Sequence, residues 1–388
     1  MPSDDRHLVE KLQAVIEESD FEWSLQLIAE DPTHKLATLT ADLSGKPSNT
    51  GDGKQITSGF AYWGTAPTIA WSAACNDRFY PVMQQSIESF SGRWKRVRSK
   101  LDGVPYHYVS LGVGTGQKDG VILPDLLGVQ PKLLYVPVDL SAAMLRIGVR
   151  ESARAVNLAP TQALPVQLDF AIPDNMAELR GLLQRLIGDE PVLYSLLGNT
   201  LANFDDDVEL LRTLTGQLRP QDRFLLEVAT TEALDDDLAD AAAEEYHRSR
   251  AYGEFVTSAL MMYTDLTINM DSVLYRGSVE GDRALQVKVI YQNRTGADLR
   301  FMLPDRTKVA FPDRDTIRLY LSRKYTPRGL DAMLAAAEIK KLQGIHSGFT
   351  QQRSPRAFGT DLVLLAGGDR VPEQRASKAD EIWSSFRT

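Results

Sequence analysis

The chain has 388 residues, of which 43% are hydrophobic and 24% are charged, and its formal net charge is −9. This composition is typical of a globular protein with one large domain and a smaller one. It argues against nucleic acid as the main partner, and no apolar run reaches the roughly eighteen residues of a membrane span. The acidic start has no apolar signal-peptide core, and the single Cys75 excludes an internal disulfide, so we expect a cytoplasmic protein.

The first hundred residues predict a helix, a loop and a second helix. Apolar residues recur at helical spacing over residues 4–19, and a stretch rich in Gly, Pro, Ser and Asn follows at 45–54. Residues 81–101 form an amphipathic pattern whose basic run at 93–100 is typical of a solvated helix face. We assign residues 1–104 to an N-terminal helical region that contributes to a substrate domain.

From residue 105 to 230 the pattern alternates between strands and helices. Apolar strands are predicted at 106–111, 133–141, 164–170, 192–197 and 223–230, and helices at 118–128, 141–156, 177–187 and 207–218. Strands and helices that alternate at this spacing predict a parallel sheet with right-handed crossovers. The sequence therefore predicts an α/β core.

After residue 230 the alternation stops. Residues 232–266 predict one or two helices, and period-two strands follow at 284–293, 298–304 and 307–312. We interpret residues 231–316 as an α+β insertion over the sheet. Residues 317–388, with a strand at 317–325, a helix from Thr326 and a strand at 358–366, complete the core.

A glycine turn follows the first core strand directly. Gly112, Gly114 and Gly116 allow the backbone to turn sharply and to approach a ligand closely, and the next helix offers its N-terminal amides. An ordinary tight turn is the alternative. The dinucleotide fingerprint fails, because Gln117 stands where its third glycine belongs.

Polar residues also follow the next three strands. Asp139 suits a pair of ribose hydroxyls or a helix N-cap; Asp169 and Phe170 suit an adenine ring or a simple strand-to-loop turn. A polar, glycine-containing loop at 197–204 follows the fourth strand. Open α/β sheets bind ligands at the carboxyl ends of their strands, so four such features in succession predict a ligand site there.

The segments LGVGTGQKD, YVPVDLSAAML, LDF and LLGNTLANF resemble the histidine-specific methyltransferase family. The best-known members of that family are the histidine α-N-methyltransferases of the ergothioneine pathway. The resemblance covers residues 105–230 and, more faintly, 317 to the C-terminus. It implies a class I Rossmann-like methyltransferase domain with a second, smaller α+β substrate-binding domain, and S-adenosylmethionine as the cofactor.

The resemblance implies a role for individual residues. Gly112, in the glycine turn, and Lys118 would face the cofactor. Asp139 would hold the ribose, and Asp169 with Phe170 would hold the adenine.

On the substrate side, the resemblance implies that Asn203 contacts the amino-acid end of the substrate and that Tyr246 grips its carboxylate. Tyr62 matches a tyrosine of the substrate pocket, with a core aromatic as the alternative.

One position departs from the family pattern. The family has an acid two residues before a serine, and both address the histidine imidazole. Here Ser322 is kept, but Tyr320 stands in place of the acid. A phenol cannot pair ionically with an imidazolium, so we expect a methyl acceptor other than histidine.

These observations predict an N-methyltransferase for a small amino acid or an amine-bearing metabolite. Glu227 is the candidate that orients the amine or takes its proton, with a capping or loop acid as the alternative. The five histidines show no metal-binding spacing, so no metal is expected. An O-methyltransferase or a macromolecule-modifying enzyme on the same scaffold, and a cofactor-binding regulatory subunit without activity, remain alternatives, and the oligomeric state stays open.

Overall fold

The computed structural model describes residues 14, 26–29, 32–57, 59–349, 355 and 357–367. The helix expected over residues 4–19 lies outside the described residues, apart from residue 14.

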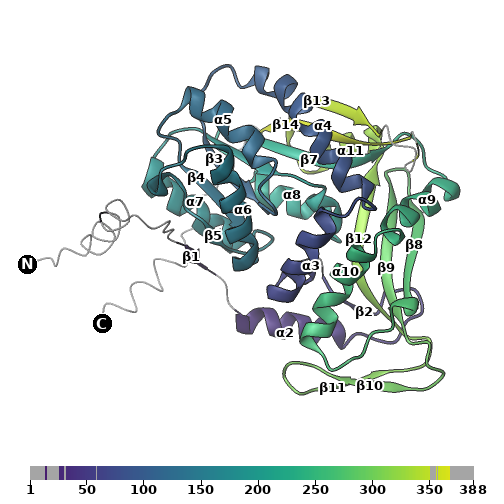
Figure 1. Ribbon diagram of the computed structural model, residues 1–388. Helices are drawn as coiled ribbons and strands as arrows, with labels where there is room; N and C mark the ends of the chain where they lie inside the picture. The colour runs from purple at the N-terminus through teal and green to yellow at the C-terminus, as the bar shows by residue number, and fades with distance from the viewer. Residues whose placement is uncertain are drawn as a thin grey trace, which may run out of the picture.

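One large sheet runs through the molecule (Figure 1). Its strand order is β1-β5-β4-β3-β6-β7-β12-β9-β8, and β14 and β13 extend it beside β7. The strands of the core half are parallel: β1 (Leu27–Ile28), β3 (His107–Leu111), β4 (Tyr135–Asp139), β5 (Val166–Gln167), β6 (Val192–Leu196) and β7 (Arg223–Thr231). Every residue of β3, β4 and β6 is buried, as expected for parallel strands covered on both faces.

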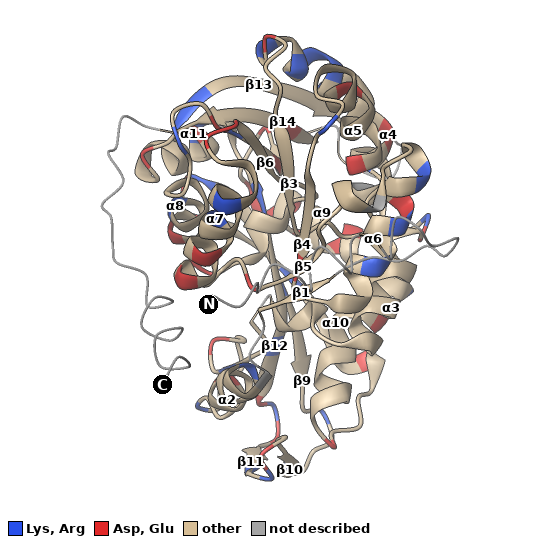
Figure 2. Ribbon diagram, turned by 90° about the vertical axis from the view of Figure 1, so that its left-hand side faces the viewer, with Lys and Arg blue, Asp and Glu red and all other residues tan. Residues whose placement is uncertain are grey.

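Helices cover both faces of this half, which Figure 2 shows edge-on. On one face lie α7 (Pro173–Ile187), α8 (Asp207–Thr215) and α11 (Pro327–Ala336), which share a hydrophobic core with the strands. On the other lie α4 (Pro81–Val97), α5 (Asp119–Val129) and α6 (Ala142–Ala155). The predicted α/β core is therefore confirmed.

Helix α4 lies in the region of residues 1–104 that we assigned to the substrate domain, but it packs against the core sheet. Phe90 and Trp94 of α4 pack with Leu123 of α5 and Leu364 of the core sheet. An apolar stripe on α4 has to be buried, and the core sheet offers the matching face. Residues 81–97 thus belong to the core layer, whereas α2 (Pro32–Leu43) and α3 (Thr65–Cys75) lie with the insertion.

The insertion extends the same sheet. Its helices are α9 (Asp236–His247) and α10 (Arg250–Tyr263), and its long strands are β8 (Val273–Glu280) and β9 (Ala284–Gln292). Strand β9 pairs antiparallel with β12 (Thr316–Tyr325), which carries the sheet on to β7 and also pairs with β2 (Lys54–Gln55). Helices α3 and α10 pack side by side, and β10 (Leu299–Met302) and β11 (Lys308–Phe311) form a separate hairpin (Figure 1).

Residues 32–80 and the insertion share one hydrophobic core that reaches Tyr320 on β12. The sequence did not predict α2, α3, β8 or β13 (Lys340–Gly348), whereas β14 (Phe358–Ala366) matches the predicted closing strand. Within the part of the chain that the structure describes, no helix is long and apolar enough to cross a membrane.

Candidate active site

An outer cavity of about 1000 Å³, its open mouth included, lies beyond the carboxyl ends of β3 to β6. The structure brings together here all seven residues expected to hold the cofactor: Gly112, Gly114, Gly116, Lys118, Asp139, Asp169 and Phe170.

The glycine turn has a backbone that other residues rarely adopt. Gly112, Gly114 and Gly116 have φ angles of 67°, 55° and 74°. A Cβ on Gly116 would lie 2.3 Å from the carbonyl oxygen of Gly148 in α6. Glycine at 116 therefore brings the turn against α6 and leaves the cavity open above it.

Asp139 ends β4 with its carboxylate buried beside the turn. It accepts hydrogen bonds from the amides of Gly114 (3.3 Å) and Ser141 (3.0 Å), and burial raises its pKa to about 6. The N-cap of α6 is Ser141, whose hydroxyl accepts from the amide of Met144, so capping does not account for Asp139. Among the described residues no cation pairs with this carboxylate, which leaves it suited to ligand hydroxyl donors.

Asp169 and Phe170 form another part of the cavity wall. Asp169 accepts from the amide of Ala171 (3.0 Å) and pairs with Lys35 of α2. Phe170 packs against Phe204, with ring centroids 6.2 Å apart. The wall therefore combines a carboxylate with two aromatic rings, a combination suited to a flat polar ring.

An inner cavity of about 400 Å³ adjoins the outer one, and Tyr62, Trp71, Met83 and Gly198 line both. The structure brings together here all five residues expected to bind the substrate, and Glu227 with them: Tyr62, Asn203, Tyr246, Tyr320 and Ser322.

Hydroxyl groups dominate the inner wall. The hydroxyls of Tyr62 and Tyr320 are 2.5 Å apart, and the amide of Asn203 donates to Tyr62 (3.4 Å). The hydroxyl of Tyr246 is 2.9 Å from that of Ser322. Burial raises the pKa of all three tyrosines, so these hydroxyls are neutral hydrogen-bonding groups at ordinary pH. Tyr62 also packs within an aromatic cluster, so it is both a lining and a core residue.

Glu227 is not at the end of its strand, as the sequence suggested, but midway along β7. It lies just beyond the point where the neighbouring β6 ends. One carboxylate oxygen accepts from Ser86 (2.8 Å) and Arg93 (2.7 Å), and the other from Lys118 and the amide of Gly198 (2.8 Å).

This surrounding fixes the charge of Glu227. Burial alone would raise its pKa, but Lys118 and Arg93 outweigh it and lower the pKa to about 2. A carboxylate with four donors and so low a pKa is a poor proton acceptor near neutral pH. Glu227 lines the inner cavity, and through Lys118 and the amide of Gly198 it is bonded to residues that line the outer one.

Several lining or supporting residues were not predicted from the sequence, and all but one of them carried no local signal. They are Lys35, Trp71, Tyr80, Ser86, Arg93, Asn199 and Thr360. Only Asn199 had a detectable signature: it follows a glycine in a polar loop, and its φ of 65° is a conformation that asparagine tolerates well. Of the described residues, no three His, Cys, Asp or Glu side chains are grouped so that they could hold a metal ion.

The chain is also similar to known proteins. A family model described as "Histidine-specific methyltransferase, SAM-dependent" matches residues 70–349. A search of curated protein sequences found no match.

Among solved structures, an S-adenosylmethionine-dependent methyltransferase from Clostridium acetobutylicum ATCC 824 is 14% identical, with 72% of this chain and 92% of that chain covered and a TM-score of 0.38. The magnesium protoporphyrin IX methyltransferase from Synechocystis PCC 6803 is 8% identical, with 79% and 96% covered and a TM-score of 0.40. The CcbJ methyltransferase from Streptomyces caelestis is 17% identical, with 72% and 96% covered and a TM-score of 0.35. The family model, in contrast, spans well over half of the chain, and the chain therefore belongs to the histidine-specific, S-adenosylmethionine-dependent methyltransferase family.

Proposed function

We propose that this methyltransferase transfers the methyl group to the nitrogen of a small amino acid or another amine-bearing metabolite, and that this acceptor is not histidine. The observation that carries the proposal is the hydroxyl pair of Tyr62 and Tyr320, two phenols that line the inner cavity. An imidazolium would need a carboxylate there, and the phenols offer only neutral hydrogen bonds.

The outer cavity fits the cofactor on its own geometry. The Gly116 turn leaves room for a close approach of the ligand, and the buried Asp139 carboxylate has acceptor capacity left for ribose hydroxyls. We assign Asp169 and Phe170 to the adenine, and Lys118 to the amino-acid end. When bound, S-adenosylmethionine supplies an electrophilic methyl group on its sulfonium.

The size of the inner cavity favours a small acceptor over a macromolecule. Its empty space is about 400 Å³, and buried aromatic rings such as Trp71, Tyr80 and Tyr246 line it. We assign Asn203, with Tyr246 and Ser322, to the polar amino-acid end of the acceptor.

The groups that line the inner cavity also favour nitrogen over oxygen as the acceptor atom. A hydroxyl nucleophile needs a base. Among the described residues of this lining, the titratable groups are tyrosines such as Tyr80, Tyr246 and Tyr320 with raised pKa, and Glu227 with a pKa of about 2. An amine needs no such base, because burial away from water lowers its own pKa and it can enter neutral. The chain's contribution is then alignment and exclusion of water.

The test is a methyl-transfer assay with S-adenosylmethionine and a panel of amino acids and small amines, read by mass spectrometry. We expect an N-methylated product from an acceptor with an uncharged side chain and none from histidine. Tyr320→Glu should bring in histidine binding, because a carboxylate can pair with the imidazolium; Tyr320→Phe is the matched control and should not.

Efficient methylation of histidine by the wild type, or an O-methylated product, would overturn the proposal. Cofactor binding with no turnover on any amine would favour the regulatory-subunit alternative. We place the reaction in the cytoplasm, on the sequence argument from the single cysteine, Cys75, whose thiol is buried.

A further inference from the structure

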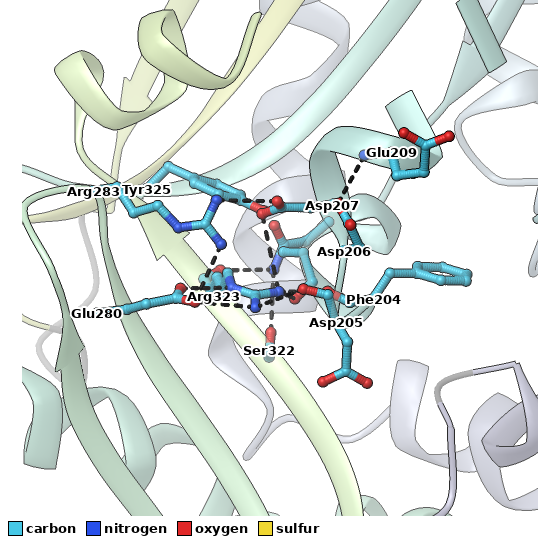
Figure 3. A network of polar contacts seen from close by, with 12 residues as sticks. Phe204, Asp205, Asp206, Asp207, Glu209, Glu280, Arg283, Ser322, Arg323 and Tyr325 are labelled. Atoms are coloured by element: carbon cyan, nitrogen blue, oxygen red, sulfur yellow. Dashed lines mark hydrogen bonds and ion pairs between the residues drawn. The ribbon is translucent and has the colours of Figure 1, made fainter. Parts of the chain in front are cut away.

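Arg323 lies buried between the core and the insertion, at the centre of the polar network in Figure 3. It is on β12, next to Ser322, whose hydroxyl lines the inner cavity. Successive residues of a strand point to opposite faces of the sheet. One face of β12 therefore presents Tyr320 and Ser322 to the inner cavity, and Arg323 points away from it.

The guanidinium of Arg323 holds the loop after β6 by its main chain. It donates to the carbonyl oxygens of Phe204 (2.5 Å), Asp205 (3.2 Å) and Ala202 (3.5 Å). In return, Asn199 of the same loop donates from its side chain to the carbonyl oxygen of Arg323 (3.1 Å). A main-chain carbonyl that is shielded from water needs a hydrogen-bond donor. Removing the guanidinium would therefore leave these acceptors without the partner that holds them.

This loop supplies wall residues to both cavities. The 3₁₀ helix η4 (Thr200–Asn203) places Asn203 in the inner cavity. Phe204, the residue after it, lines the outer cavity and packs against Phe170. A shift of the carbonyl of Phe204 would therefore move groups in both cavities.

The other side of the guanidinium is held by the insertion. Glu280, at the end of β8, accepts from Arg323 through both carboxylate oxygens (2.6 and 3.2 Å). Burial would raise the pKa of Glu280, but the bonds from Arg323 and Arg283 hold it below its usual value, so the carboxylate stays charged. The turn between β8 and β9 thus sets the direction of the guanidinium.

Arg283 provides a built-in comparison. It also donates to Glu280 (3.1 Å), and it pairs with Asp207 (3.0 Å), to which Tyr325 donates as well (2.6 Å). None of the interactions described for Arg283 involves a carbonyl of the β6 loop, and its side chain is 27% exposed. Arg323 also lies 3.9 Å from Asp207, so the two arginines share Glu280 and Asp207 and differ in their contact with the loop.

We propose that Arg323 is a positioning residue for methyl transfer. It fixes the position of the β6 loop relative to β12. Phe204 in the outer cavity and Asn203 in the inner cavity are thereby held at fixed positions relative to Tyr320 and Ser322. Arg318 holds the side chain of Asp205 independently, and that contact lies outside both cavities.

The experiment measures S-adenosylhomocysteine binding by calorimetry and the thermal midpoint for four proteins: wild type, Arg323→Met, Arg323→Lys and Arg283→Met. We expect Arg323→Met to weaken binding by about tenfold or more, and Arg323→Lys to recover part of the loss, because an ammonium can reach some of the same acceptors. Arg283→Met should lower the midpoint and leave binding within about twofold of wild type.

Unchanged binding by Arg323→Met, or an equal loss of binding in Arg283→Met, would overturn the positioning role and leave a merely structural network. If Arg323→Met does not fold, the affinity of Arg323→Lys for S-adenosylhomocysteine is compared with that of Arg283→Met. Weaker binding by Arg323→Lys supports the positioning role, and equal binding overturns it. The readout uses the cofactor product alone, so it holds whichever acceptor the enzyme methylates, and failure of the proposed acceptor would not affect it.

Discussion

Cofactor binding should depend on pH through Asp139. In the ligand-free protein burial raises the pKa of this carboxyl from 3.8 to about 6. If Asp139 holds the ribose, as we propose, the ribose hydroxyls donate more strongly to the charged carboxylate than to its protonated form, so binding favours ionisation and lowers the pKa again. The affinity for S-adenosylhomocysteine should therefore rise as the pH rises through about 6, and level off above it.

The size of the effect follows from the two protonation states. At pH 5, about one pH unit below the folded pKa, roughly nine molecules in ten carry the proton, so the affinity should be about tenfold lower than at pH 8. The raised pKa also means that the ligand-free protein loses stability as the pH rises from about 4 to about 6. The shift of about two units corresponds to about 3 kcal/mol.

The assay is calorimetry at pH 5, 6, 7 and 8, with wild type beside Asp139→Asn. The variant should bind poorly at every pH and lose the dependence, while its ligand-free form gains up to about 3 kcal/mol of unfolding free energy at pH 8. Asp119 also has a pKa raised to about 6 by burial, despite hydrogen bonds from Tyr135 and Tyr108, and any contribution from it would persist in the variant. A flat profile for the wild type, or an unchanged profile in Asp139→Asn, would refute the reasoning.

Three further outcomes are expected. Gly116→Ala should lower the unfolding free energy, measured by chemical denaturation, by several kcal/mol, because its Cβ would lie 2.3 Å from the carbonyl oxygen of Gly148. Gly114→Ala, whose Cβ would have its nearest contact at 3.9 Å, should lower it by about 1–2 kcal/mol. Equal losses would contradict the packing argument. Glu227→Gln should cost about 3–5 kcal/mol of unfolding free energy, since it leaves two buried cations without their counter-charge; lost activity with full stability would instead favour a proton-accepting role. Thr360→Val should stabilise the ligand-free protein by about 1 kcal/mol in the same assay, because the buried hydroxyl has no partner among the described residues, and a loss of stability would indicate a partner that the structure does not describe.

Local pattern was sufficient for the core of the fold. The strands β3, β4 and β6 are buried runs of mostly apolar residues, and helices α6 and α7 have clear amphipathic spacing. Parallel strands bring their carboxyl ends to one edge of the sheet, so residues at successive strand ends meet there without further information. For this reason Asp139 and Asp169 could be predicted to share one cavity.

The shape of the inner cavity could not be read in the same way. Tyr62 and Tyr320 form a hydroxyl pair across a separation of 258 residues, and Arg93 reaches Glu227 across 134. No periodicity relates such positions. The resemblance to a family suggested Tyr62 and Tyr320 one by one, but it could not indicate that the two phenols bind each other.

The sequence by itself determined the alternating core, the glycine turn and the acids at the strand ends, because each depends on neighbours a few residues away. Only the tertiary structure decided that α4 covers the core sheet, that Lys35 of α2 pairs with Asp169, and that Glu227 is held by cations and is a poor base. These contacts depend on which apolar faces find one another, and on the cost of burying a charge without a partner. Both are properties of the packed chain.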